Sequence, residues 1–174
     1  MKLLAIYDDP YYEDQGITQL RYTSRVFLRN NEGKYAFLRI VGEDGFGLRD
    51  HIESAGGGVE EGETFLEAAQ REVAEELGFK ANQFQLIGMV IDEYHLIERM
   101  TCSVFFSAQL SQDSGKTQRT QEETILIQTV EWLLPHEVLG RLTTANSPVG
   151  SLIHRRDLTA FVEHLTQLQT NQTE

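Results

Sequence analysis

The sequence has little cysteine, comparatively few basic residues and no long hydrophobic run. Its single cysteine, Cys102, excludes an internal disulfide, and its strand-like neighbourhood favours a small buried residue over a nucleophile. Acidic residues outnumber basic ones by 27 to 15, and the net charge of −12 argues against a nucleic-acid-binding surface. The apolar run at residues 3–7 is too short for a signal peptide, and no later run is long enough to span a membrane. We therefore expect a cytoplasmic protein without nucleic-acid or membrane partners.

The residues that suggest chemistry are concentrated at positions 56–79, where a glycine-rich turn precedes a short amphipathic segment. Thr64 and Glu67 have the T-x-x-E spacing of a capping box, which predicts that a helix begins at Thr64. Gly78 suits the left-handed position that ends a helix, and Phe79 then supplies an apolar contact with the last turn. The predicted buried face of this helix consists of Leu66, Ala69, Val73 and Leu77.

Three carboxylates, those of Glu72, Glu75 and Glu76, are neighbours on the last two turns of the predicted helix. Like charges repel at this spacing, and the C-terminal end of the helix dipole is unfavourable to anions. A bound divalent cation removes both penalties, and ligands that are all oxygen favour Mg²⁺ or Mn²⁺. Arg71 lies two turns beyond Glu63, so we expect these two residues to pair and to support the site by holding the glycine turn against the helix.

The same residues resemble the signature of the Nudix (MutT-like) hydrolases, G-x5-E-x7-R-E-U-x-E-E-x-G-U, in which U is a bulky apolar residue. All seven fixed residues are present: Gly57, Glu63, Arg71, Glu72, Glu75, Glu76 and Gly78. Two positions depart from the pattern, because Phe79 stands where an aliphatic residue is usual and Ala55 where many members have proline. The resemblance implies an α/β fold, a Nudix-type α/β/α sandwich with a mixed β-sheet. It also implies a metal site in which the Gly57 carbonyl joins Glu72, Glu75 and Glu76.

The rest of the chain is consistent with a single Nudix domain over residues 1–174. β-Branched and aromatic runs predict strands at residues 1–7, 20–29, 34–41, 83–92, 101–110 and 125–134, with a hairpin turn at residues 30–33 and a loop at residues 42–47. Residues 1–20 would form an N-terminal strand and turn, and residues 143–174 a C-terminal helix and tail. Ser147 and Pro148 predict the start of that helix, and residues 170–174 are expected to fray. Its predicted core-facing residues are Leu158, Phe161, Val162, Leu165 and Leu168.

Several residues outside the signature are candidates for substrate binding. Arg49 is a candidate phosphate contact and His51 a candidate for the edge of the substrate, although either residue could equally be a solvated loop charge. Tyr94 and Arg99 belong to a polar segment that either lines a substrate pocket or simply connects two strands.

Residues 111–123 are rich in Ser, Gln and Thr and predict a mobile surface loop. Nudix enzymes frequently take a further carboxylate, as base or ligand, from a loop in this part of the chain. Glu122 and Glu123 are the candidates, against the alternative of two solvated charges. Glu72, Glu76, Glu122 and Glu123 therefore all remain candidates for the general base.

The resemblance implies Mg²⁺- or Mn²⁺-dependent hydrolysis of a diphosphate bond in a small-molecule nucleotide, a nucleoside diphosphate linked to a group X. ADP-ribose or a nucleotide sugar, a nucleoside triphosphate and a dinucleoside polyphosphate are the competing substrates. A non-catalytic nucleotide-sensing module is the alternative of another class, but such modules often lose the signature glutamates that this chain retains. Many relatives are homodimers, and nothing in the sequence requires or excludes one here.

Overall fold

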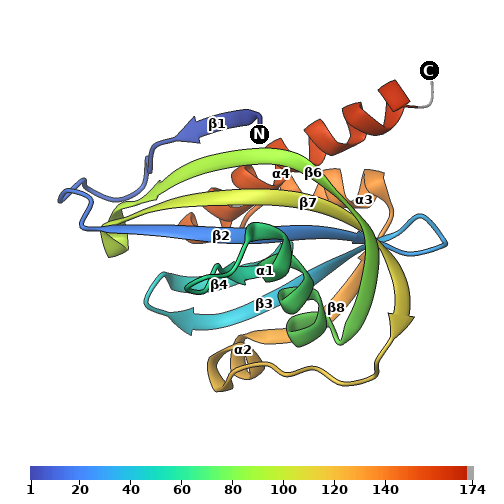
Figure 1. Cartoon of the computed structure of the whole chain (residues 1–174). Coiled ribbons are helices and arrows are strands. Elements are labelled where there is room, and N and C mark those ends of the chain that lie inside the picture. Colours follow the sequence, from blue (N-terminus) through green and yellow to red (C-terminus); the bar gives the residue numbers. More distant parts are fainter. Residues whose placement is uncertain (172–174) are drawn as a thin grey trace.

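The structure, a computed structural model, describes residues 1–171 and contains one eight-stranded sheet with helices on both faces (Figure 1). The strands are β1 (Leu3–Tyr7), β2 (Gln19–Arg29), β3 (Tyr35–Asp44), β4 (Gly47–Glu53), β5 (Ala55–Gly58), β6 (Phe79–Tyr94), β7 (Arg99–Asp113) and β8 (Ile127–Leu133). The helices are α1 (Phe65–Glu72), α2 (Gln121–Leu126), α3 (Pro135–Leu142) and α4 (Pro148–Asn171), with a π-helical turn η1 (Val73–Leu77) and a 3₁₀ turn η2 (His95–Ile97). Within residues 1–171, no helix combines the length and the apolar character needed to cross a membrane.

The sheet is mixed, as predicted. Its strand order is β1-β6-β7-β2-β3-β4, with β5 beside β2 and β8 beside β3. β1 is parallel to β6 and β2 is parallel to β7. The other pairs are antiparallel.

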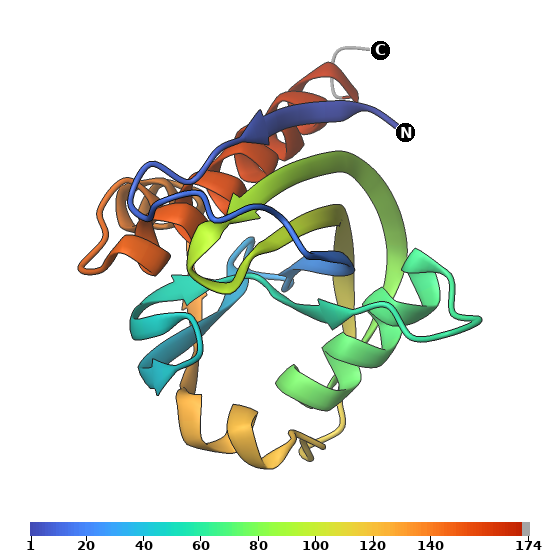
Figure 2. The same ribbon diagram turned by 90° about the vertical axis from the view of Figure 1, so that its left-hand side faces the viewer.

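Two buried cores lie on opposite faces of the sheet, which confirms the α/β/α sandwich (Figure 2). The first core packs α1, η1 and α2 against the sheet and includes Ala69, Val73 and Leu126. The second packs α3 and α4 against the other face and includes Val138 and Phe161. Alternation along β3 serves both cores, because successive side chains of a strand point to opposite faces. Ala36, Leu38 and Ile40 belong to the first core, and Tyr35 and Phe37 to the second.

The sheet divides between β2 and β3. These strands meet at one pair, Arg29 with Tyr35, beside the turn at residues 30–33. From there β2 continues between β7 and β5, whereas β3 continues between β4 and β8. The predicted turn is therefore confirmed, but the pairing does not extend along the two strands, and the two halves of the sheet separate toward one end of the molecule.

Several predicted boundaries are wrong. Residues 42–47 are not a loop, because β3 and β4 pair as far as Asp44 with Gly47 and leave only residues 45–46 at the tip. β6 and β7 are longer than predicted, because they pair from Phe79 with Asp113 onward. The added residues are mostly polar, so the sequence does not mark them as strand. Residues 111–123 are likewise not one loop, since β7 reaches Asp113 and α2 begins at Gln121.

Two residues assigned to buried helical faces are exposed. Leu66 is 40% exposed and Val162 is 48% exposed. Each follows an aromatic residue that packs on a core, Phe65 or Phe161, and neighbouring residues on a helix lie about 100° apart around the axis. The helix therefore buries the aromatic residue and turns the next one outward. α4 also continues to Asn171, so the predicted fraying is wrong at residues 170–171, and residues 172–174 lie outside the described part of the chain.

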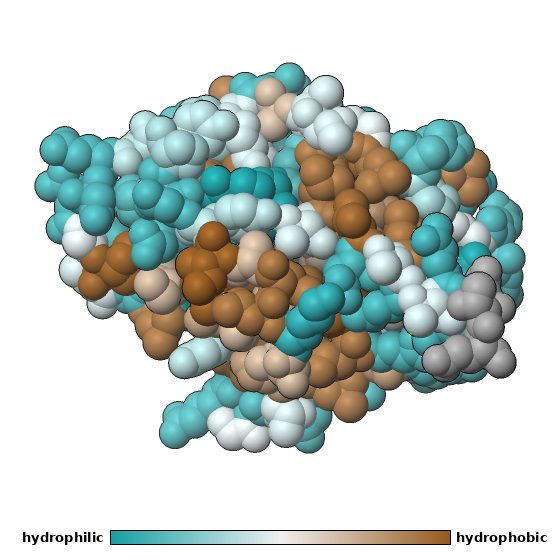
Figure 3. All heavy atoms as spheres, turned by 90° about the horizontal axis from the view of Figure 1, so that it is seen from above, coloured by the Kyte–Doolittle hydropathy of each residue, from teal (hydrophilic) through white to brown (hydrophobic). Residues whose placement is uncertain are grey.

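The edge strand β1 keeps apolar side chains exposed, including Leu3 and Ile6, which are 48% and 64% exposed. Figure 3 views the molecule from the side of β1 and shows apolar patches interrupted by polar atoms.

Candidate active site

The site is built on the helix that runs from α1 into η1. Its predicted start is confirmed, because the backbone nitrogen of Glu67 donates to Thr64 Oγ1 at 3.2 Å and that of Thr64 donates to Glu67 Oε2 at 2.9 Å. Its predicted end is also confirmed, with Gly78 in the left-handed conformation at φ +72°. No sequence pattern indicated that the last turn, Val73–Leu77, is π-helical, a distortion that is frequent at functional sites.

Residues 56–58, predicted as a glycine turn, belong instead to the strand β5, which pairs with β2. Glu72 and Glu76 are buried together beside this glycine segment, each only 5% exposed. Glu76 Oε2 accepts a hydrogen bond of 2.7 Å from the backbone nitrogen of Gly56. Gly57 lies so close to Glu72 that a Cβ added to it would be 2.3 Å from Glu72 Oε1. Burial, followed by the charge of Glu72, raises the pKa of Glu76 well above its ordinary value, and burial likewise raises the pKa of Glu72. Both carboxylates therefore lack sufficient positive charge in the surrounding protein.

Arg71 holds the glycine segment against the helix, as predicted. Its Nε and Nη2 donate to the two carboxylate oxygens of Glu63 at 2.9 Å and 3.0 Å, and Nη2 also donates to the Gly58 carbonyl at 2.9 Å. Its Nη1 donates to Glu72 Oε1 at 2.7 Å and to Glu75 Oε2 at 3.0 Å, two contacts that were not predicted. The guanidinium thus fixes three of the signature carboxylates at once.

In their present orientations, only some of the predicted ligands could bind a hard divalent cation together. Glu72, Glu76 and the backbone at Gly57 form a cradle of oxygen ligands that a side chain at position 57 would fill. Glu75 is turned to Arg71 and half-buried, so its carboxylate would have to leave Arg71 to join an ion. Glu72 accepts from the same Arg71 Nη1, but it also lies against Gly57, so Glu72 and Glu76 are the better placed of the three predicted glutamate ligands.

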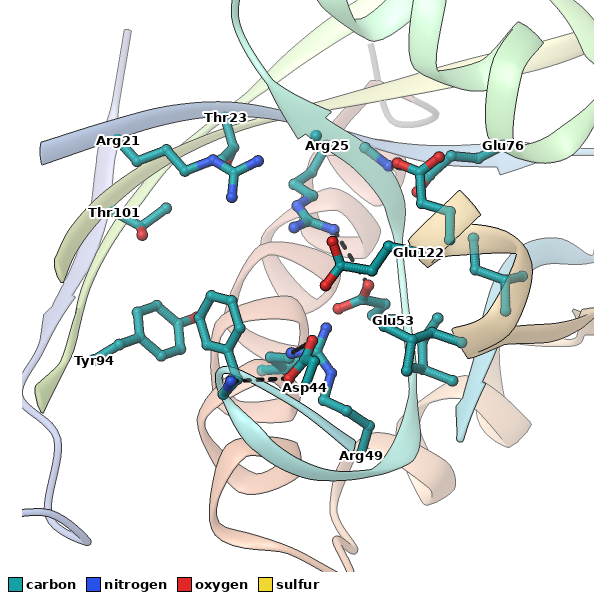
Figure 4. A pocket seen from close by; sticks show the side chains of 18 of the residues that line it. Arg21, Thr23, Arg25, Asp44, Arg49, Glu53, Glu76, Tyr94, Thr101 and Glu122 are labelled. Atoms are coloured by element: carbon teal, nitrogen blue, oxygen red, sulfur yellow. Dashed lines mark hydrogen bonds and ion pairs between the residues drawn. The ribbon is translucent and has the colours of Figure 1, made fainter. Parts of the chain in front are cut away.

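A pocket of about 220 Å³ opens beside Glu76, where the two halves of the sheet separate (Figure 4). It combines Arg21, Thr23 and Arg25 from β2 with groups from β4, β7, α2 and α4. Five arginines line it: Arg21, Arg25, Arg49, Arg99 and Arg156. A chain with a net charge of −12 thus gathers a third of its 15 basic residues around one cavity. The same cavity is lined by as many carboxylates, those of Asp44, Glu53, Glu76, Glu122 and Glu123, so it suits an anionic ligand that is accompanied by a cation.

Sequence reasoning missed three of these arginines. Arg21 and Arg25 could have been found, because Arg21, Thr23 and Arg25 alternate along one face of a strand whose later residues are apolar. Arg21 Nη2 lies 3.2 Å from the position of a Cβ on Gly58, so this side chain borders the glycine segment. Arg156 carries no such signal, since it lies on a helix between two other charged residues.

Glu53, also missed, is one of the carboxylates that line the pocket. Its carboxylate oxygens lie 3.9 Å from Arg25 Nη1 and 4.0 Å from Arg156 Nη2. Burial raises the pKa of Glu53, but the charge of Arg25, with His51 and Arg49, outweighs burial and holds the pKa well below its ordinary value. Glu53 therefore stays ionised and orients arginines rather than exchanging protons.

The two candidate carboxylates on α2 have different surroundings. Glu123 closes a capping box, because its Oε2 accepts from the backbone nitrogen of Thr120 at 2.8 Å. Glu122 points into the pocket beside Arg25 and Glu53 (Figure 4). Both residues line the cavity, but the carboxylate of Glu122 is the one that the fold leaves available.

The predicted substrate residues Arg49, Tyr94 and Arg99 also come together, around Phe46 at the tip of the β3–β4 hairpin. The guanidinium carbons of Arg49 and Arg99 lie 5.1 Å and 5.5 Å from the Phe46 ring centroid, and the Tyr94 ring meets it edge-on at 5.7 Å. His51 does not reach this pocket. It is buried in β4 with Nε2 3.6 Å from Glu53, so it is neither a substrate contact nor a solvated charge.

Comparisons with known proteins agree with this geometry. The NUDIX domain family model matches residues 19–155, and no curated protein matches the sequence. A NUDIX hydrolase from Nitrosomonas europaea superposes with a TM-score of 0.67 at 16% identity, covering 86% of this chain and 90% of that one. The MutT protein from Methanosarcina mazei Go1 gives 0.60 at 19% identity, with 87% and 96% covered. A structure described as an ADP compounds hydrolase gives 0.64 at 21% identity, with 92% and 78% covered. With its signature glutamates and Arg71 gathered beside Gly57 and the family model spanning most of its length, this chain belongs to the Nudix hydrolase family.

Proposed function

We propose that this protein is a pyrophosphohydrolase that cleaves the diphosphate bond of a nucleoside diphosphate linked to a group X, with Mg²⁺ or Mn²⁺ as cofactor. The observation that carries the proposal is the buried pair Glu72 and Glu76, of which Glu72 lies against Gly57 and Glu76 accepts from Gly56 and lines an arginine-bearing pocket. A carboxylate pair suits a cation, and the neighbouring arginines suit the phosphates that accompany it.

Each part of the site has a distinct task. Glu72, Glu76 and the Gly57 carbonyl, with Glu75 once it is released from Arg71, would hold the ion, which neutralises phosphate charge and lowers the pKa of attacking water. Arg21 and Arg25 lie against the glycine segment and would hold phosphoryl oxygens in the orientation for attack.

We assign the general base to Glu122. It points into the pocket, whereas Glu123 caps its own helix and Glu72 and Glu76 are needed for the cation. A carboxylate so placed can accept the proton of the attacking water. Glu63 and Arg71 support the glycine segment and transfer no proton.

The group X would occupy the part of the pocket beneath Phe46, where Arg49, Tyr94 and Arg99 converge. An anionic or hydroxyl-rich group suits these donors, as in ADP-ribose or a nucleotide sugar. ADP-ribose is therefore the first compound to test, before nucleoside triphosphates and dinucleoside polyphosphates.

The test is hydrolysis of a nucleotide panel in the presence of Mg²⁺ or Mn²⁺, with a coupled phosphatase, phosphate detection and mass analysis of the products. Glu76→Gln should abolish turnover, while Glu61→Gln, which changes an exposed glutamate of the turn after β5, should not. Binding of panel nucleotides without turnover by the unaltered protein would instead favour the non-catalytic sensing module.

A further inference from the structure

A second group of metal-ligating side chains lies where the segment after β1 meets the end of β6. Asp8, Glu93 and His95 each offer one ligand atom, and these atoms all lie within 4.8 Å of one another. His95 Nε2 is 3.2 Å from Asp8 Oδ1 and 3.2 Å from Glu93 Oε2. The imidazole is buried, whereas the Asp8 side chain is 80% exposed, so the group is open to solvent on one side.

Two of the three separations, those from His95 Nε2, match the separations of ligands around a small tetrahedral ion. Zinc bonds to imidazole nitrogen and carboxylate oxygen of about 2.0–2.1 Å place neighbouring tetrahedral ligand atoms about 3.3 Å apart. Both nitrogen–oxygen separations in the group are within about 0.1 Å of that value.

The surrounding backbone orients two of the three ligands, His95 and Asp8. His95 Nδ1 lies 3.0 Å from the Tyr12 carbonyl, which accepts a hydrogen bond from the protonated Nδ1 and so directs Nε2 at the two carboxylates. The backbone nitrogen of Asp9 donates to Asp8 Oδ1 at 2.8 Å. The buried Asp9 carboxylate accepts from the backbone nitrogens of Tyr11 and Tyr12 through Oδ1, and from that of His95 through Oδ2 at 3.0 Å. Partners of this kind fix the orientation of metal-binding histidines and carboxylates.

We propose that Asp8, Glu93 and His95 bind Zn²⁺ or a related first-row transition-metal ion, with solvent completing the coordination. The imidazole ligand separates this site from the oxygen-only set at Glu72 and Glu76, which suits Mg²⁺ or Mn²⁺. Without an ion, the same three side chains would form an ion pair between protonated His95 and the two carboxylates, and this is the alternative that the experiment must separate.

The ion would brace one wall of the pocket. It would fasten residues 8–12 to the segment at residues 93–95, which contains Tyr94 of the pocket lining. Tyr12 extends from the fastened segment to the β3–β4 hairpin, where its hydroxyl lies 3.9 Å from the position of a Cβ on Gly47, next to Phe46. This role is structural and does not depend on hydrolysis.

The experiment is a Zn²⁺ titration of the metal-free full chain carrying Glu72→Gln and Glu76→Gln, so that the active-site glutamates do not compete. We expect one Zn²⁺ per chain by elemental analysis and a Zn²⁺-dependent rise in thermal midpoint. Adding Asp8→Asn or His95→Gln should weaken Zn²⁺ binding at least about tenfold, because a direct ligand is removed. His136→Gln, which changes an exposed histidine on α3, is the matched control and should leave the affinity unchanged.

Asp8→Asn is the variant that should fold normally, because the Asp8 side chain is mostly in solvent, so a loss of Zn²⁺ binding in it cannot be ascribed to misfolding. Equal Zn²⁺ affinity in the parent, Asp8→Asn and His95→Gln proteins would overturn the proposal. So would a parent protein that takes up no zinc but gains stability as His95 is protonated, which would assign the group to an ion pair. Neither result bears on nucleotide hydrolysis, which is assayed with Mg²⁺ and depends on other residues.

Discussion

Replacing Gly57 by alanine should disable the site through one displaced carboxylate. The added Cβ would lie 2.3 Å from Glu72 Oε1, whereas ordinary contact begins at 3.4 Å, so Glu72 must move by about 1.1 Å. A misplacement of about 1 Å at a catalytic centre can cost about 100-fold in rate, which corresponds to about 2.7 kcal/mol of transition-state stabilisation. We therefore expect kcat/KM for the nucleotide identified by the panel to fall about 100-fold.

Gly140→Ala is the matched control, because a Cβ at that helical position meets no atom within 4 Å. It should leave the rate unchanged and stabilise α3 by up to about 1 kcal/mol. A double-mutant cycle of Gly57→Ala with Glu72→Ala tests whether the clash with Glu72 causes the loss of rate. Gly57→Ala should have little further effect once the clashing carboxylate is gone. A Gly57→Ala protein with a rate within twofold of the parent would refute the reasoning, as would a full 100-fold loss in the Glu72→Ala background.

Three further predictions concern the surroundings of the site and the core. Glu122→Gln should lower kcat by about 10²–10⁴-fold and remove the acidic limb of the pH–rate profile. Glu123→Gln should leave kcat and stability nearly unchanged, because glutamine can also accept from the backbone nitrogen of Thr120 and close the capping box. Similar rates for the two variants would contradict the assignment of the base. Arg71→Lys replaces a forked guanidinium by a single ammonium and should lower the free energy of unfolding by about 2–3 kcal/mol, as measured by urea denaturation; an unchanged midpoint would show that the fork is dispensable. Burial, and then Arg29, lowers the pKa of His164 to about 4, so its stabilising contribution is lost as the pH falls from about 6.5 through 4. Urea denaturation should show a loss of about 2 kcal/mol between pH 8 and pH 5 that His164→Gln lacks, and equal losses in both proteins would contradict this.

Features encoded by neighbouring residues could be predicted from the sequence. The capping box at Thr64, the left-handed Gly78 and the pairing of Arg71 with Glu63 depend on spacings within a few turns of one helix. Such spacings keep their geometric meaning wherever the helix packs.

Features assembled across the fold could not be predicted in this way. Arg25, Glu53 and Arg156 become neighbours only after β2, β4 and α4 have packed together, and no local pattern relates them. Glu122 and Glu123 are adjacent in sequence, and only the position of the helix start, at Thr120, distinguishes their roles. The spacing of Thr120 and Glu123 is itself a capping-box signal, and it could have assigned Glu123 to the cap before the structure was known.

The separation of β2 from β3 has a consequence for how ligands affect the molecule as a whole. Since one residue pair joins these strands directly, side chains on either side of the pocket are linked mainly through more distant strands and α4. A ligand that contacts Arg25 on β2 and Arg49 on β4 would connect the two halves of the sheet at a place where no backbone hydrogen bond between described residues joins them directly. Occupancy should therefore raise the thermal midpoint and slow amide hydrogen exchange along β2 and β4 together, including in a Glu122→Gln protein that binds without turnover.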